Sequence, residues 1–328
     1  MTSLPADVLL VTGPDEARQV LDDDRTFRAA RMEEYVPGVS RSFFLATDVS
    51  DPESGARCRE ALAAFLAPDR LRALHRDLIA PAAAGRVAKL AAEFRATPDY
   101  LRSYGRQVSY ALAGIDAADG PAMVAKVRLA GTLLAEDRRS ADGRALINDV
   151  KRQLRSMALH SGFAPDGLPG LALARRLATV DEAVLLALPL LEMAAFDMNT
   201  SLAAAALRRT AQLSPAEQRE LLDPAQLRRL VWEAAADLTD LLATRVATCP
   251  MTVGATPVAP GDRVVVDLHA ANQTGLDHLS FGRGRHACMG RELAMTIGIA
   301  PVKAILRRGW IAAQTGGDLV VRIHPWAA

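Results

Sequence analysis

The segment from Leu279 to Gly290, LSFGRGRHACMG, concentrates residues able to do chemistry around a single thiol, Cys288. It contains three glycines, two arginines and one histidine. Glycine loses more conformational entropy on folding than other residues, and arginine is costly to bury. A turn that collects both types around one cysteine therefore indicates a backbone that wraps around a bound group.

Cys288 stands just before a helix predicted to begin near Gly290, where free backbone N–H groups and the helix dipole lower a thiol pKa. A thiolate binds soft metals, but no second cysteine lies nearby and His286 is two residues away, so a zinc site lacks its usual ligand pairs. One thiolate suffices where a macrocycle supplies the other donors, as in haem ligated by cysteine. The alternative is a buried structural cysteine beside a helix-capping glycine loop.

The pattern Phe281-Gly-x-Gly-x-His-x-Cys288-x-Gly-x-x-Leu-Ala closely resembles the haem-binding signature of bacterial cytochrome P450 enzymes. The resemblance implies haem b, iron protoporphyrin IX, as the cofactor and Cys288 as the axial ligand of its iron. It also implies that Phe281 packs beside the sulfur and that His286 contacts a haem propionate. The remaining cofactor-binding positions of the signature are Gly282, Gly284, Gly290 and Ala294.

Two arginines outside the turn extend the resemblance. Arg59, in a segment that begins Asp51-Pro-Glu, is similar to the C-helix arginine of the family and is implied to reach a propionate, although Gly55 stands where histidine is frequent. Arg245 is similar to the arginine after the family's K-helix, which implies a second propionate contact. Each arginine alone is also compatible with a solvated surface charge, but together they suit two carboxylates that need partners.

The chain departs from the family in its central helix. There the family has small residues followed by an acid–alcohol pair that delivers protons during cleavage of the O–O bond, whereas this chain has Phe196-Asp-Met-Asn-Thr-Ser201. The alcohol, Thr200, is kept and the acid is replaced by Asn199, which can hold a water but cannot transfer a proton in the same way. We name Thr200 and Asn199 as the candidate catalytic residues, with ordinary monooxygenation in question.

Two further departures concern the K-helix and the loop before the cysteine turn. The Glu-x-x-Arg motif of the family matches Glu233-Ala-Ala-Ala236, which lacks the arginine. Only residues 273–278 separate Asn272 from Leu279, so the usual loop that joins this ion-pair network is missing too. We therefore expect a shortened relative whose N-terminus begins near the family's first strands.

Hydrophobic periodicity predicts the elements that position these residues. We expect a mainly α fold with small β-sheet elements, similar to cytochrome P450, as a single haem-binding domain over residues 1–328. Proline at positions 68 and 81 is expected to break the helical region 51–92. The expected helices are 15–21, two or three within 51–92, 100–115, 122–137, 144–160, 182–213, one from 214, 227–242 and 290–308, with a loop at 162–170 and strands at 8–11, within 252–266 and around 312–323.

Composition limits the function classes. The formal net charge of +1 over 328 residues argues against a general nucleic-acid or anionic-membrane binder. The N-terminus lacks a basic region ahead of its apolar run, so no signal peptide is expected, and the apolar stretch 183–195 is too short to span a bilayer. Three widely spaced cysteines fit a reducing cytoplasm, where we expect the protein to reside.

The leading expectation is a haem-thiolate oxidoreductase, a P450-like monooxygenase that hydroxylates or otherwise oxidises a small apolar or carrier-bound substrate in secondary metabolism. Its electrons are expected from a ferredoxin and its reductase docking on arginines 57, 59, 283, 285 and 291. One alternative is a peroxygenase or a non-redox P450-like enzyme, and another is a haem-free scaffold domain. The expected pocket-forming segments are 31–44, 162–170 and 185–196.

Overall fold

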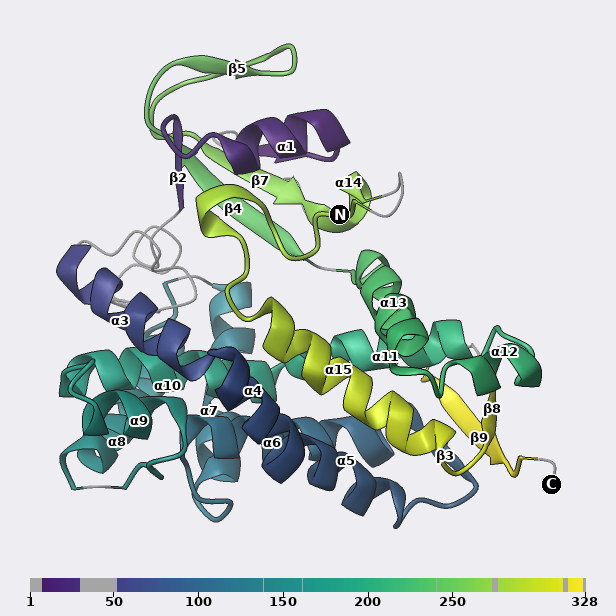
Figure 1. The fold of residues 1–328 in the computed structure, drawn as a ribbon. Helices are drawn as coiled ribbons and strands as arrows, with labels where there is room; N and C mark the ends of the chain where they lie inside the picture. The colour runs from purple at the N-terminus through teal and green to yellow at the C-terminus, as the bar shows by residue number, and fades with distance from the viewer. Residues whose placement is uncertain are drawn as a thin grey trace.

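The computed structural model describes residues 8–29, 52–137, 139–160, 162–239, 241–272, 277–314 and 318–326. Figure 1 shows a broad body of helices and, above it, a small sheet covered by one short helix. The predicted pocket segment 31–44 lies outside the described residues. The mainly α architecture with small sheets confirms the predicted fold class.

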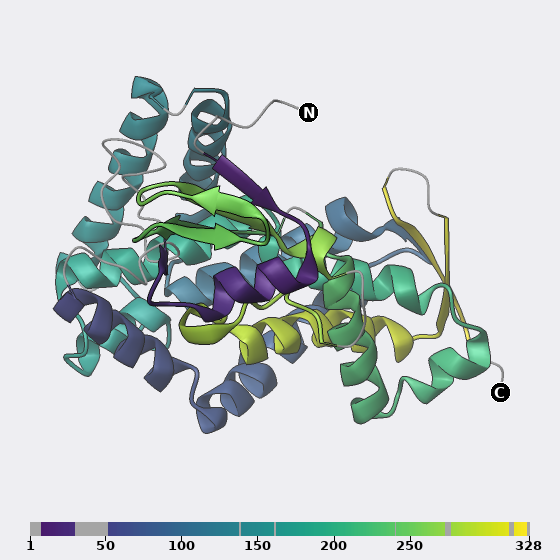
Figure 2. The same cartoon turned by 90° about the horizontal axis from the view of Figure 1, so that it is seen from above.

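The upper sheet has the strand order β1 (Val8–Val11), β7 (Arg263–Asp267), β4 (Leu242–Ala247) and β2 (Phe27–Ala29). β1 runs parallel to β7, and the other pairs are antiparallel. Helix α1 (Pro14–Asp22) begins with a proline, which suits the first turn, and lies along these strands in Figure 2. Its buried face packs on β7, so residues from both ends of the chain share one small core.

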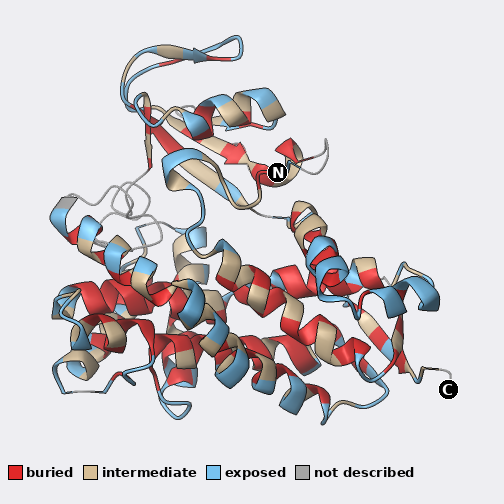
Figure 3. Ribbon diagram, in the orientation of Figure 1, coloured by how far each residue is buried: buried red, intermediate tan, exposed pale blue. Residues whose placement is uncertain are grey.

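The helical body holds the larger hydrophobic core, and Figure 3 shows buried residues along its central helices. Its helices are α3 (Pro52–Phe65), α4 (Pro68–Leu74), α5 (Ala80–Val87), α6 (Arg102–Ala113), α7 (Gly120–Glu136), α8 (Ala141–Leu159), α9 (Leu168–Ala174), α10 (Val180–Ala195), α11 (Met198–Thr210), α12 (Pro215–Glu220), α13 (Pro224–Ala234) and α15 (Arg291–Leu306). A short helix, α14 (Leu268–Ala271), follows β7. The smaller sheets are β5 (Met251–Val253) with β6 (Thr256–Val258), and β3 (Glu93–Arg95), β9 (Val320–His324) and β8 (Trp310–Gln314) in that order.

The central helix is predicted as one segment, 182–213, but the structure divides it into α10 and α11. α10 starts with a capping box in which the Thr179 side chain accepts from the Glu182 backbone and the Glu182 carboxylate accepts from Thr179. The division falls at Phe196 and Asp197, and Asp197 has a left-handed φ of 56°. Among the described residues, one helical passage, Val180–Thr210, is long and apolar enough to cross a membrane, and 72% of its apolar window is buried inside the fold. That burial is expected of a central helix.

Three other predicted boundaries are wrong. Pro81 does not break the helical region, because a π-turn over His75–Ile79 carries the chain from α4 into α5, where proline occupies the first turn. The predicted loop 162–170 ends early, since α9 starts at Leu168. The predicted helix 227–242 ends in a 3₁₀ turn at Asp237, before β4 begins at Leu242.

Candidate functional site

The cysteine turn is a tight loop whose two ends are hydrogen bonded to each other. The Cys288 N–H donates to the carbonyl of Phe281 at 2.7 Å, and the Gly282 N–H donates to the Leu279 carbonyl at 2.7 Å. Gly282 and Gly284 both adopt a φ of 65°, a left-handed conformation that favours glycine. A Cβ at Gly284 would lie 2.6 Å from the carbonyl oxygen of Leu21 in α1, so this turn needs glycine for space as well.

Cys288 presents its sulfur at the start of α15. Of the three cysteines in the chain, Cys58 is buried, Cys249 is half-buried and Cys288 is exposed. Protein atoms around the thiol still desolvate it, which raises the pKa of Cys288, while the Gly290 backbone and the Arg291 charge lower it less. The start of α15 lowers the pKa of the thiol, as predicted, but by less than burial raises it. Cys288 is exposed as a residue, and a cation bound to its sulfur would have to stabilise the ionised form.

Aromatic stacking fixes the entry to the turn against α13. The ring of Phe281 stacks on Trp232 with centroids 5.6 Å apart and planes 19° apart. His278 lies on the same indole at 4.4 Å, and the Arg291 guanidinium lies 5.8 Å from its centroid. Phe281 therefore has one orientation, held by a helix that is distant in sequence.

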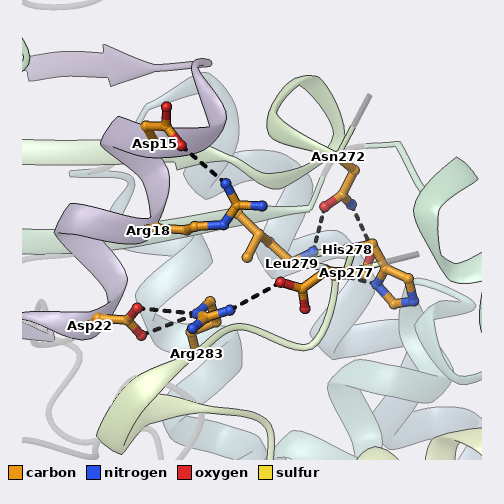
Figure 4. Close-up of polar contacts among 9 residues, drawn as sticks. Asp15, Arg18, Asp22, Asn272, Asp277, His278, Leu279 and Arg283 are labelled. Carbon is orange, nitrogen blue, oxygen red and sulfur yellow. Dashed lines mark hydrogen bonds and ion pairs between the residues drawn. The ribbon is translucent and has the colours of Figure 1, made fainter. Parts of the chain in front are cut away.

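The sequence lacks the long loop that the P450 family has ahead of the turn. Polar contacts hold the chain at this place instead (Figure 4). The Asn272 carbonyl oxygen accepts from the Leu279 N–H at 2.5 Å, and its amide donates to the Ser280 hydroxyl at 2.7 Å. Ser280 donates to the Ala235 carbonyl at 2.6 Å, and His278 Nε2 lies 2.9 Å from the Trp232 carbonyl. Carbonyls at the end of α13 thus anchor the turn directly.

The described arginines of the predicted docking face are partly committed to internal ion pairs. Arg283 joins the turn to α1 through Asp22 at 3.2 Å and also lies 3.5 Å from Asp277, as Figure 4 shows. Arg57 lies 2.6 Å from the buried carboxylate of Glu182. Arg291 is 3.4 Å from Glu292 and half its side chain is exposed, and Arg285 is exposed. Arg57 and Arg283 are thus held in ion pairs, while Arg285 and Arg291 are exposed.

The predicted propionate partners come from three separate elements. Arg245 lies in β4 between Ala29 and Val264, is 7% exposed, and donates to the Thr244 carbonyl at 3.1 Å. Arg59 is half-buried on α3, and His286 is half-buried in the 3₁₀ turn Gly284–His286. A buried guanidinium is costly unless anions compensate it. The types of these side chains, one cysteine with two arginines and a histidine, suit an anionic macrocycle.

Comparison with known proteins identifies the architecture. No protein-family model and no curated protein matches the chain. Solved structures do match it. P450BioI, bound to an acyl carrier protein ligated with hexadec-9Z-enoic acid, has a TM-score of 0.78 at 17% identity, covering 96% of this chain and 92% of that chain. The chain has the cytochrome P450 fold.

Two further P450 structures agree. Ligand-free CYP164A2 of Mycobacterium smegmatis has a TM-score of 0.76 at 19% identity, covering 98% of this chain and 92% of that chain. The LnmZ cytochrome P450 hydroxylase, from the leinamycin biosynthetic pathway of Streptomyces atroolivaceus S-140, has a TM-score of 0.74 at 22% identity, covering 95% and 93%. At these identities the likeness shows the P450 fold, and it does not specify a reaction.

Asn199 and Thr200, the predicted catalytic pair of this P450 fold, are engaged at the interface with α6. Asn199 is 6% exposed and its amide donates to the Gly105 carbonyl and the Ser109 hydroxyl, both at 2.8 Å. The Thr200 hydroxyl donates to the Asp197 carbonyl at 3.0 Å. A Cβ on Gly105 would lie 2.6 Å from the Thr200 methyl, so the helices touch. In the described part of the chain, no hydrogen bond links the pair to the cysteine turn.

Sequence reasoning missed two carboxylates on the central helices of the fold. Asp197 lies 2.9 Å from Arg102 of α6 and 3.8 Å from Arg128 of α7. Glu192 of α10 is half-buried, and burial raises its pKa to about 7, partly offset by Lys151. Aspartate tolerates left-handed φ better than most residues, which was the available signal for the break. The partners of Asp197 are too distant in sequence to be inferred.

The missing K-helix arginine is replaced by cations from elsewhere. Glu233 lies 2.9 Å from Arg229, one turn earlier in α13, and 3.9 Å from Arg209 of α11. Arg209 also pairs with Asp237, which follows α13. These contacts keep the glutamate paired without the motif's arginine, in line with the cost of an isolated charge.

Proposed function

We propose that this chain is a haem-thiolate oxidoreductase that binds haem b through Cys288. The observation that carries the proposal is an exposed cysteine on a left-handed glycine turn at the start of α15, within a P450 fold. No group of three or more histidine, cysteine or acidic residues that could hold a metal occurs among the described residues. A macrocycle that brings four nitrogen donors needs one thiolate from the protein.

The residues around the turn fit such a group. Arg245, Arg59 and His286 would pair with the two propionates, and burial of Arg245 in β4 favours an anion beside it. Gly282, Gly284 and Gly290 would let the backbone of the turn pass close to the group, and Phe281, stacked on Trp232, would pack beside the sulfur. Bound haem with a thiolate ligand supplies oxidation chemistry that no amino-acid side chain provides.

We propose a small apolar or carrier-bound substrate and an oxidative step in biosynthesis. Three similar structures support this class: P450BioI complexed with a ligated acyl carrier protein, a mutant of P450 EryK complexed with erythromycin B, and LnmZ of the leinamycin pathway. The largely buried, apolar α10 supports a site with few polar anchors. Electrons would come from an acidic ferredoxin attracted by the exposed arginines beside Cys288, chiefly Arg285 and Arg291.

A second function is favoured by the orientation of Asn199. Both N–H groups of its amide donate to α6 and Thr200 donates to Asp197, so neither side chain is a ready proton donor in this conformation. An enzyme that uses peroxide, or that rearranges its substrate without an oxidant, needs less proton delivery. Turnover with hydrogen peroxide alone, compared with ferredoxin, reductase and NADPH, separates this proposal from monooxygenation.

The test is the absorption spectrum of the purified chain, reduced and treated with carbon monoxide. We expect a strongly red-shifted Soret band, because a thiolate ligand donates charge to the iron. Cys288→Ser should abolish that band, while Cys249→Ser, which changes the half-buried cysteine, should keep it. A chain that refuses added hemin, or a Cys288→Ser spectrum identical to the original, would overturn the proposal.

A further inference from the structure

A hollow lies away from the cysteine turn, between α5, α6 and the first residues of α7. Its volume is about 910 Å³, large enough for a small organic molecule. Much of its wall is apolar, including Leu78, Pro81, Ala82, Ile115 and Pro121. None of the residues of the cysteine turn lines it, so it is separate from the proposed haem site.

The charged side chains that line this hollow are positive. Among the described residues, Arg86, Lys89, Arg102 and Arg106 line it and no aspartate or glutamate does. Two of the four are engaged: Arg102 pairs with Asp197 at 2.9 Å, and Arg86 donates to Gln107 at 3.4 Å. Over the residues that the structure describes, neither Lys89 nor Arg106 forms an ion pair. A chain with a net charge of +1 thus gathers a local excess of positive charge over an apolar wall.

Two side chains that line this hollow carry buried donor atoms for which the described residues supply no acceptor. Tyr110 is 7% exposed, and its hydroxyl is buried without a hydrogen-bond partner, as is the Nε of Arg106. The two residues are four apart on α6, so their side chains share one face of the helix. The ring of Tyr110 is pinned, because a Cβ on Gly120 would lie 2.8 Å from three of its carbons. Buried donors are normally satisfied, so an acceptor is missing here.

The protonation state of Tyr110 supports its role as a hydrogen-bond donor. Burial raises the pKa of Tyr110, and the nearby Arg106 only partly opposes that shift, so the hydroxyl carries its proton at neutral pH. A guanidinium offers N–H donors and no acceptor. Both groups can donate to the same anion, and Lys89 can approach it from the exposed rim.

We propose that the hollow between α5, α6 and α7 binds an amphipathic organic anion. Its carboxylate or phosphate head accepts hydrogen bonds from Tyr110 and Arg106, with Lys89 as a further counter-ion. Its apolar body lies along the wall formed by residues such as Pro81 and Ile115. Arg102 keeps its ion pair with Asp197, so the head group is bound by Tyr110, Arg106 and Lys89.

Binding is measured by isothermal titration on the purified full chain. The probes are octanoate and octyl phosphate as amphipathic anions, inorganic phosphate as the head alone, and 1-octanol as the body alone. We expect both amphipathic anions to bind more tightly than either half, and the tighter of the two identifies the head group. Binding should weaken as salt is raised, because the contacts are charged.

Arg106→Gln and Tyr110→Phe should each weaken binding by about tenfold or more, since each removes a hydrogen bond to a charged group. Arg72→Gln, on α4 and outside the hollow, should leave the affinity unchanged. Without ligand, Tyr110→Phe should unfold at the same or a higher temperature, because its hydroxyl has no partner to lose. Equal affinity in all three variants, or no binding of either anion, would overturn the proposal. A lower unfolding temperature of ligand-free Tyr110→Phe would contradict it too, by showing that the hydroxyl has a structural partner.

Discussion

At the scale of single residues, the cysteine turn depends on backbone geometry more than on charge. Burial raises the pKa of Cys288 despite the start of α15, so the turn offers the sulfur without ionising it. The turn does provide a fixed backbone conformation, because Gly282 and Gly284 hold left-handed φ angles and Phe281 is stacked on Trp232. The sequence was sufficient to locate this turn, since its spacing is local. The stacking partner, 49 residues earlier, was not inferable from local spacing.

Substitution of Gly284 tests that geometry. In Gly284→Ala, the new Cβ meets both a strained φ and the Leu21 carbonyl at 2.6 Å, so α1 or the turn must move. We expect a loss of about 2 to 3 kcal/mol in the free energy of unfolding, measured by urea denaturation. The control is Gly85→Ala in α5, where a Cβ meets nothing within 4 Å and stability should rise by up to about 1 kcal/mol. Equal effects of the two substitutions would show that the turn is not constrained.

At the scale of elements, local pattern predicted the ends of the chain best. Val8–Val11 follows from a short apolar run, α1 from Pro14 and α15 from helical period, and all three are confirmed. The division of the central helix was missed because the apolar pattern continues through Phe196. The left-handed turn at Asp197 sets how α11 is rotated, so that Asn199 meets Gly105 and Asp197 reaches Arg102, both on α6. Such rotation is set by tertiary packing.

The break at Asp197 combines a backbone preference with two ion pairs, and these are separable. Asp197→Asn keeps a residue that tolerates left-handed φ but removes the charge opposite Arg102 and Arg128, which should cost about 1 kcal/mol. Asp197→Ala should cost about 1 kcal/mol more, because alanine is strained at a φ of 56°. Both are measured by urea denaturation. If Asn and Ala prove equal, the left-handed conformation contributes nothing to stability.

At the scale of the whole molecule, two glutamates of α10 make stability depend on pH in opposite directions. Burial would raise the pKa of Glu182, but hydrogen bonds from Arg57 of α3, the Thr179 backbone and Ser54 outweigh it and lower the pKa to about 2. This contribution is present above pH 4.5 and is lost as the pH falls toward 2. For Glu192, burial raises the pKa to about 7, so its contribution is full below pH 4.5 and is lost by pH 7.

Urea denaturation between pH 5 and 8 separates the two groups. Glu192→Gln mimics the neutral acid, so its stability relative to the unmodified chain should rise by about 2 to 3 kcal/mol across this range, at about 1.4 kcal/mol per pKa unit. Glu182→Gln, the control on the same helix, should lose about 3 kcal/mol at every pH in the range, because Glu182 stays ionised throughout. Half-buried His75 and buried His278, whose pKa values burial lowers, add an opposite trend near pH 6 that is common to all three proteins and cancels in the differences. Parallel curves for Glu192→Gln and the unmodified chain would mean that the Glu192 carboxyl is hydrated and that α10 is less enclosed than its packing indicates.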